Sequence, residues 1–161
     1  MIELFTRNFL GIPADCHLTP IPAGEDISSL SAILLGDDYY GFIANSRINI
    51  AGVPTIPVQC LIPLKARAYL DLIERKASGA NVDSGHIKKH RNDVFRLYLT
   101  LAPADRFDLP DQLRHDLDRF LEELPEGSPD WRSIRAAVEN LPDSRQVVDQ
   151  LRQNFGIVAQ G

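Results

Sequence analysis

Three ionisable residues occupy positions where the helical pattern calls for apolar side chains. The apolar periodicity predicts two consecutive helices, over residues 60–78 and 86–101. At 100° per residue, Lys65 projects into the apolar arc of the first helix. His90 falls inside the apolar stripe of the second helix, and Asp93 lies at its edge. A buried ammonium group is costly unless it is paired or faces a cleft, so these residues are candidates for chemistry.

Two explanations fit this pattern. Lys65 and Asp93 either form a structural ion pair between the helices, with His90 a satisfied core histidine, or they face an anionic ligand together. The charge distribution bears on the choice, because residues 61–100 carry a net charge of +4 within a chain of net charge −5. This concentration favours an anionic ligand over a general nucleic-acid surface. The exposed face of a solvated helix would give the same charge pattern.

The surrounding sequence predicts the elements that position these residues. Before the two helices we expect the elements at 1–5 (strand), 6–25 (connector), 26–35 (helix), 37–44 (helical turn), and 47–51 and 53–58 (strands around Gly52). After them we expect helices at 111–124, 128–141 and 143–154. The fold class is therefore α+β, with a few short N-terminal strands followed by a predominantly helical bundle. We expect two domains, over residues 1–57 and 58–161.

The segments LIPLKARAYLDLIERKASG and DSGHIKKHRNDVFRL, in this order, resemble the C-terminal part of nucleotidyltransferase-fold proteins of the AbiEii type. These proteins are toxins of abortive-infection and toxin–antitoxin systems. The family's lysine helix has the form LxxLKxxAxxxR, which Lys65 and Ala68 match, with Arg75 placed slightly later than usual. Its second, basic helix ends in Arg/Asn-Asp and a leucine, matched by residues 91–93 and Leu97. The resemblance is clearest over about forty residues.

The resemblance implies roles for individual residues. The first strand would be part of a nucleotidyltransferase sheet, and Glu3 would be the third metal-binding carboxylate. Lys65 would contact a nucleotide phosphate, with Asp93 orienting it or a nearby water. The substrate-binding residues would be Lys89, His90 and Arg91.

The family's Gly-Ser turn and Asp-x-Asp pair, which precede that third carboxylate, have no counterpart ahead of Glu3 in this sequence. Two-metal nucleotidyl transfer needs a carboxylate cluster for Mg²⁺, and one glutamate cannot assemble it. The resemblance implies transfer of a nucleotide to an RNA or protein acceptor. We therefore expect a nucleotidyltransferase-like chain that is catalytically incomplete and binds no metal by itself.

The alternative is a protein-interaction module without chemistry of its own. The opening MIELF strand would present an unpaired edge, and such an edge favours a homodimer or an antitoxin-like protein partner. The composition is that of a globular protein, with 44% hydrophobic and 24% charged residues, and no apolar run is long enough to cross a membrane. Two cysteines without metal-like spacing fit a reducing cytoplasm.

Overall fold

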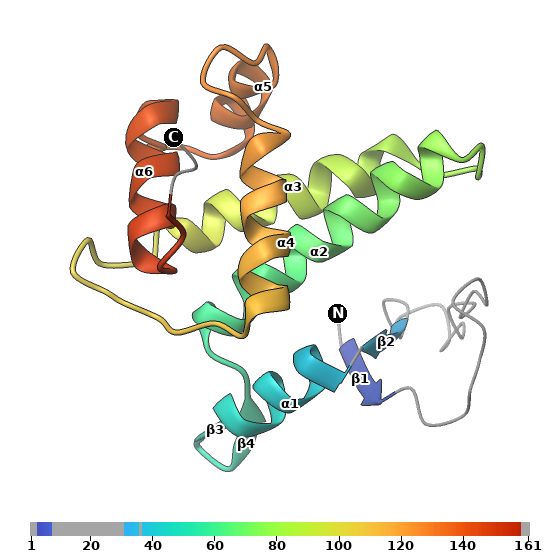
Figure 1. Cartoon of the computed structure of the whole chain (residues 1–161), viewed down its shortest axis with the longest axis vertical. Coiled ribbons are helices and arrows are strands. Elements are labelled where there is room, and N and C mark those ends of the chain that lie inside the picture. Colours follow the sequence, from blue (N-terminus) through green and yellow to red (C-terminus); the bar gives the residue numbers. More distant parts are fainter. Residues whose placement is uncertain (1–2, 8–30, 36, 159–161) are drawn as a thin grey trace. The chain divides into compact units, whose positions relative to one another are not determined.

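The computed structural model describes residues 3–7, 31–35 and 37–158 (Figure 1). The chain divides into two compact units, residues 1–45 and 46–161. The architecture is α+β, with short strands in the first third and a helical bundle after them. The predicted domain boundary after residue 57 lies beyond a hairpin that the contacts group with the helices.

The first unit contains a pair of parallel strands. Strand β1 (Glu3–Arg7) lies beside β2 (Ser31–Leu35), in a register that places Glu3 opposite Ser31. The strand predicted at the N-terminus is confirmed, whereas the helix predicted up to Leu35 is wrong over residues 31–35. A short apolar run fits a helix or a strand of a parallel sheet equally well, and here pairing with β1 decides for the strand. The rest of that predicted helix and the connector at 8–25 lie outside the described residues.

A helix and a hairpin follow. Helix α1 (Asp37–Ser46) includes the helical turn predicted at 37–44. Strands β3 (Ile48–Ile50) and β4 (Val53–Thr55) then pair in antiparallel fashion, which confirms the two strands predicted around Gly52. The predicted range of the second strand extends to residue 58, but the strand ends at Thr55, and Val58 already begins the next helix. The turn between them uses φ angles of 51° at Ala51 and 85° at Gly52, and the Gly52 N–H donates to Asn49 Oδ1 at 2.8 Å. Positive φ at both central turn residues matches the right-handed twist of a two-residue hairpin.

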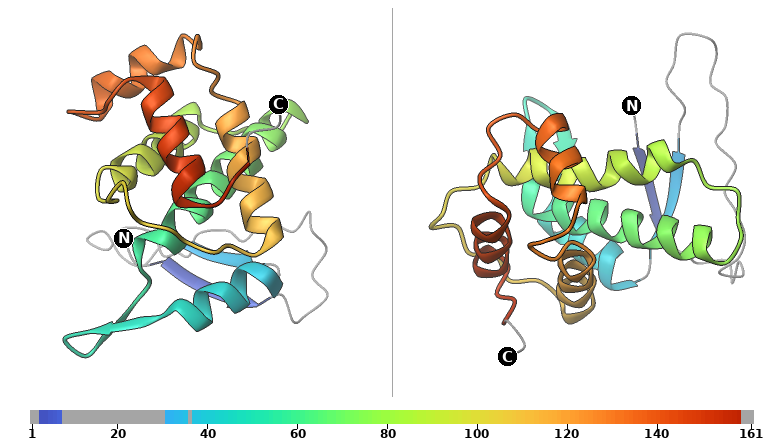
Figure 2. Two further views of the ribbon diagram at one scale, coloured as in Figure 1. Left: turned by 60° about the vertical axis from the view of Figure 1, so that its left-hand side comes forward. Right: turned by 90° about the horizontal axis from the view of Figure 1, so that it is seen from above.

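Five helices form the rest of the second unit: α2 (Val58–Ala77), α3 (Ser84–Tyr98), α4 (Asp111–Glu122), α5 (Asp130–Ala137) and α6 (Ser144–Asn154). Figure 2 shows α2 and α3 side by side along their length. Helix α4 packs on α2, and α5 packs on α3. The last helix is confirmed over its predicted range, but α5 ends four residues before the predicted limit because the chain becomes extended at Val138.

Aromatic side chains join four of these helices in one core. Phe95 of α3 lies between Phe120 of α4 and Trp131 of α5, at ring-centroid distances of 5.9 and 5.0 Å. Tyr69 of α2 meets the same Phe120 edge-on at 5.2 Å. Such pairs each contribute about 0.5–1.5 kcal/mol beyond the area they bury. The helices that carry the candidate site are therefore held by a packed core.

The long connection between α3 and α4 is fixed by the end of α6. The buried Asn154 donates its side-chain amide to the carbonyls of Ala102 and Asp105, at 3.2 and 2.7 Å. The backbone carbonyl of Asn154 accepts from the Phe107 N–H at 2.7 Å. Asn154 thus satisfies three backbone polar groups of this connection. Among the described residues, no helix is both long and apolar enough to cross a membrane.

Candidate functional site

The turn between α2 and α3 is closed by local polar contacts. Helix α2 has its C-cap at Ser78 and is followed by Gly79, which is in the left-handed region with a φ of 90°. Helix α3 begins after Asp83, whose carboxylate accepts from the Gly85 N–H at 2.7 Å. Lys76 Nζ lies 2.7 Å from Ser84 Oγ and links the two helix ends. A glycine directly after the C-cap, followed by an aspartate N-cap, is a strong stop-and-start signal, which explains why the two helices are consecutive.

Lys65 is partly buried on α2, between the buried residues Leu64 and Ala66. Asp93 is partly buried on α3, but its carboxylate lies 2.8 Å from the guanidinium of Arg96 on the same helix. The ion pair of Asp93 in the described structure is therefore local and does not join α3 to Lys65. Both residues predicted to act together are thus partly buried, and the carboxylate of Asp93 is bound within its own helix.

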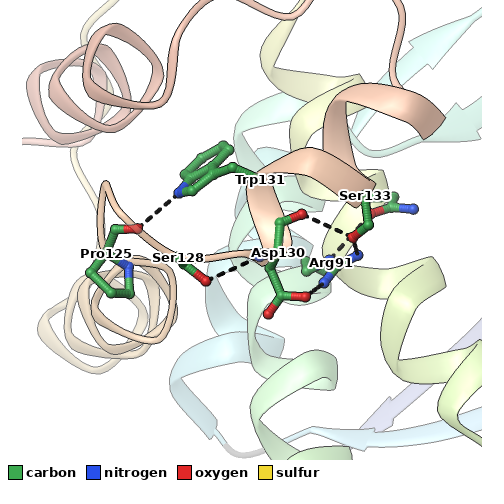
Figure 3. A network of polar contacts seen from close by, with 7 residues as sticks. Arg91, Pro125, Ser128, Asp130, Trp131 and Ser133 are labelled. Atoms are coloured by element: carbon green, nitrogen blue, oxygen red, sulfur yellow. Dashed lines mark hydrogen bonds and ion pairs between the residues drawn. The ribbon is translucent and has the colours of Figure 1, made fainter.

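Arg91 is the most deeply buried charged residue of α3, and both of its terminal nitrogens bind residues of α5 (Figure 3). One terminal nitrogen lies 2.6 Å from Asp130 Oδ1, and the other lies 2.9 Å from Ser133 Oγ. The Arg91 side chain is 5% exposed, whereas that of Asp130 is 48% exposed. Guanidinium–carboxylate contacts of this kind are charge-assisted and strong. Arg91 thus clamps the start of α5 to α3.

Two further hydrogen bonds hold the first turn of α5 in place. The Ser128 hydroxyl accepts from the Asp130 N–H at 3.3 Å, and Trp131 Nε1 donates to the Pro125 carbonyl at 3.0 Å (Figure 3). The indole is therefore packed in the core with its one polar atom satisfied. The local sequence Ser-Pro-Asp-Trp predicts a helix start, but it does not reveal that its aspartate binds Arg91.

The remaining predicted site residues occupy three different settings. Lys89 is exposed on the first half of α3, and His90 is partly buried next to Arg91. Glu3 lies on β1, but its side chain is outside the described part of the structure. Lys89, His90 and Arg91 are consecutive on a helix, so their side chains point in directions about 100° apart. The structure does not bring these three groups to one face.

Two ion pairs of opposite direction join α2 to α4. Arg67 lies 3.5 Å from the buried Asp116 of α4, and Glu74 lies 2.9 Å from Arg119 of α4. The hydrogen bond to Glu74 raises the pKa of Arg119 above its usual value. The basic residues left on the surface of α3 before Arg91 are His86, Lys88 and Lys89.

Neither a metal cluster nor a reactive thiol is evident in the described structure. Within residues 38–158, no three histidine, cysteine, aspartate or glutamate side chains converge to hold a metal ion. Cys60 is fully buried, and burial raises the pKa of its thiol, with Ser46 opposing that shift through a hydrogen bond. A buried thiol with a raised pKa is a poor nucleophile.

Comparison with protein-family models, with curated proteins and with solved structures gives no match. Similarity to the AbiEii type therefore rests on the residues of α2 and α3 quoted above.

Proposed function

We propose that this chain is a nucleotidyltransferase-like protein of the AbiEii type, and that the 161 residues alone do not complete nucleotide transfer. The observation that carries the proposal is the occurrence, in order, of the lysine-helix and basic-helix patterns on two helices that pack along their length. A helix pair of this kind fixes the spacing between Lys65 and the groups of α3. The same patterns on unrelated surface helices would carry no such constraint.

Lys65 is the residue that we assign to a nucleotide phosphate. Its side chain is partly buried, and a partly buried cation attracts a phosphate more strongly than one in bulk water. We assign Lys89, which is exposed on the first half of α3, to the phosphates of the acceptor. Arg91 is assigned to the fold, because both of its terminal nitrogens are bound to α5.

Mg²⁺ belongs to the chemistry of the intact family, and Glu3 is its proposed ligand here. Two divalent cations need several carboxylate oxygens at fixed positions, which a single glutamate does not supply. The proposal therefore separates nucleotide binding, which the helix pair supports, from nucleotide transfer, which needs further carboxylates.

Nucleotide binding tests the first part of the proposal. Calorimetric titration of the chain with each Mg²⁺-nucleoside triphosphate should show binding to one of them, and Lys65→Met should weaken it about tenfold or more. Lys88→Met is the matched control, because it removes an exposed lysine of α3 and should leave the affinity unchanged. Absence of binding, or equal loss in both variants, contradicts the role of Lys65.

Nucleotide transfer tests the second part. The 161-residue chain should label no acceptor when it is incubated with Mg²⁺ and radiolabelled nucleotide. The genomic sequence preceding the Met1 codon should be translated in frame and, if it encodes a Gly-Ser turn and an Asp-x-Asp pair, expressed together with this chain. That longer protein should transfer nucleotide, and Glu3→Gln should abolish the transfer. Transfer by the 161 residues alone would refute catalytic incompleteness.

A second candidate function is a non-catalytic interaction module that dimerises or binds an antitoxin-like partner. The observation that favours it is the hairpin of β3 and β4, where Ile48, Ile50 and Val53 are exposed. Clustered exposed apolar side chains are typical of surfaces that bind another protein. This candidate predicts a stable complex without nucleotide binding, so the titration above distinguishes the two.

A further inference from the structure

The β3–β4 hairpin presents an apolar face that its own two strands leave open. Ile48, Ile50 and Val53 are 44%, 56% and 61% exposed. The register pairs Ile50 with Val53 and Ile48 with Thr55, so these side chains lie on one face of the hairpin. A two-stranded hairpin is marginally stable in water, and an added strand stabilises it.

The two outer edges of this hairpin differ chemically. The two-residue turn makes Ile50 and Val53 a hydrogen-bonded pair, so the next pair, Asn49 and Pro54, directs its backbone polar groups outward. Pro54 has no N–H, and the outer edge of β4 therefore lacks a donor at this position. The outer edge of β3 offers both the N–H and the carbonyl of Asn49. A further strand can thus pair fully only beside β3.

We infer that this edge takes β3 of a second copy of the chain, antiparallel, with Asn49 opposite Asn49. The sequence Ile-Asn-Ile is the same in both directions, so two antiparallel copies present identical side chains to each other. The two Asn49 residues exchange both backbone hydrogen bonds. Ile48 then lies opposite Ile50 of the copy, in the closely spaced pairs where side chains contact best.

The position of Arg47 and the proline on the outer edge of β4 both support pairing with a second copy of β3. Arg47 is the only charged residue between positions 47 and 55, and the antiparallel register places it opposite Ala51 of the copy instead of another arginine. The resulting four-stranded sheet has the order β4-β3-β3-β4. Pro54 then lies on both outer edges and opposes further strand addition, so the assembly closes as a two-fold dimer and does not grow.

The interface is small, which sets the expected affinity. Stable complexes bury about 800 Å² per partner, and strands of three residues bury far less. The dimer is therefore weak and visible only at high protein concentration. This inference does not depend on nucleotide transfer. Its failure would leave the nucleotidyltransferase-like proposal untouched and would remove self-association through this hairpin from the second candidate function.

Sedimentation velocity from about 10 μM to about 1 mM tests the dimer. The unmodified chain should shift from monomer to dimer over this range. Ile48→Lys and Ile50→Glu should each raise the dissociation constant about tenfold or more, because each places a charge opposite an isoleucine. The double variant should regain dimerisation, because the lysine introduced at position 48 lies opposite the glutamate introduced at position 50 of the copy.

Val53→Lys is the matched control, because Val53 lies on the same face at similar exposure but on β4, away from the added strand. It should leave the dissociation constant unchanged. All variants are first checked for unchanged circular dichroism, which the exposure of these positions leads us to expect. A monomer at every concentration, an equal effect of Val53→Lys, or a double variant that stays monomeric would each overturn the inference.

Discussion

The two halves of α3 both carry basic residues but lie in different environments. The first half presents His86, Lys88 and Lys89 to solvent, whereas the second half buries Arg91 together with Phe95 and Tyr98. Both halves are basic, and only the second one faces α5, whose Asp130 supplies the charge that Arg91 needs in the interior. The comparison shows that a basic helix pattern does not distinguish an exposed cation from a buried, structural one.

Phe95→Ala should cause the largest loss in the free energy of unfolding. Such a loss would show that the second half of α3 is part of the core. Phe95 is fully buried and contacts the rings of Phe120 and Trp131. Truncating such a residue costs about 3–5 kcal/mol in the free energy of unfolding. Urea denaturation monitored by circular dichroism measures the loss. A change below about 1 kcal/mol would mean that this core is not formed.

Asp130→Ala should cost about 3 kcal/mol, because it leaves the buried Arg91 guanidinium without its carboxylate. Arg91→Met should cost less, since the partner left behind is half-exposed and hydrated. The double variant should therefore be more stable than Asp130→Ala alone. Asp93→Ala is the control, because it breaks a pair with the exposed Arg96 and should change stability by about 0.5 kcal/mol at most. Equal effects of Asp130→Ala and Asp93→Ala would contradict the structural role of Arg91.

Asp83→Ala should cost about 1 kcal/mol by removing the N-cap of α3. The loss should be local, because the first half of the helix has few buried contacts. Amide hydrogen exchange should accelerate at residues 84–90 and stay slow at residues 94–98. Uniform acceleration along α3 would show that its two halves unfold as one unit.

Tyr69→Phe should have its effect only at alkaline pH. Burial raises the pKa of Tyr69 above its usual value of 10.0, with nearby Glu123 and Asp130 acting in the same direction. The unfolded chain therefore loses this proton more readily, so stability is retained below about pH 10 and falls as the pH rises toward the folded pKa. Thermal unfolding from pH 8 to 11 should show a smaller decline in the variant. An identical decline would show that Tyr69 does not contribute to the loss of stability at alkaline pH.

Lys88→Met and Lys89→Met should have the smallest effect, within about 0.5 kcal/mol of the unmodified chain. Both residues are exposed on the first half of α3, where no core contact is lost. Thermal unfolding measures the change. A clear destabilisation in either variant would mean that the first half of α3 also contributes to stability. The two halves would then differ less than their exposure indicates.

Local signals in the sequence predict most of the elements. Gly52 between two β-rich runs predicts the hairpin, and Gly79 followed by Asp83 separates α2 from α3. The run Ser31–Leu35 is predicted as helix and is a strand, because its pairing with β1 involves residues 28 positions earlier in the chain. A local pattern contains no information about a partner at that distance.

For the candidate site too, the sequence predicts part of the arrangement and tertiary contacts decide the rest. Periodicity alone identifies Lys65 and Asp93 as ionisable residues on or beside apolar faces, but tertiary contacts determine what each one meets. Asp93 binds Arg96 on its own helix, and Arg91 binds Asp130, which lies 39 residues away. From α2 onward the sequence by itself thus predicts the helices and their apolar faces, because these follow from side-chain type and a fixed period. The packing of α5 on α3 decides which cation is buried, because a charge enters the interior only where another segment brings its partner.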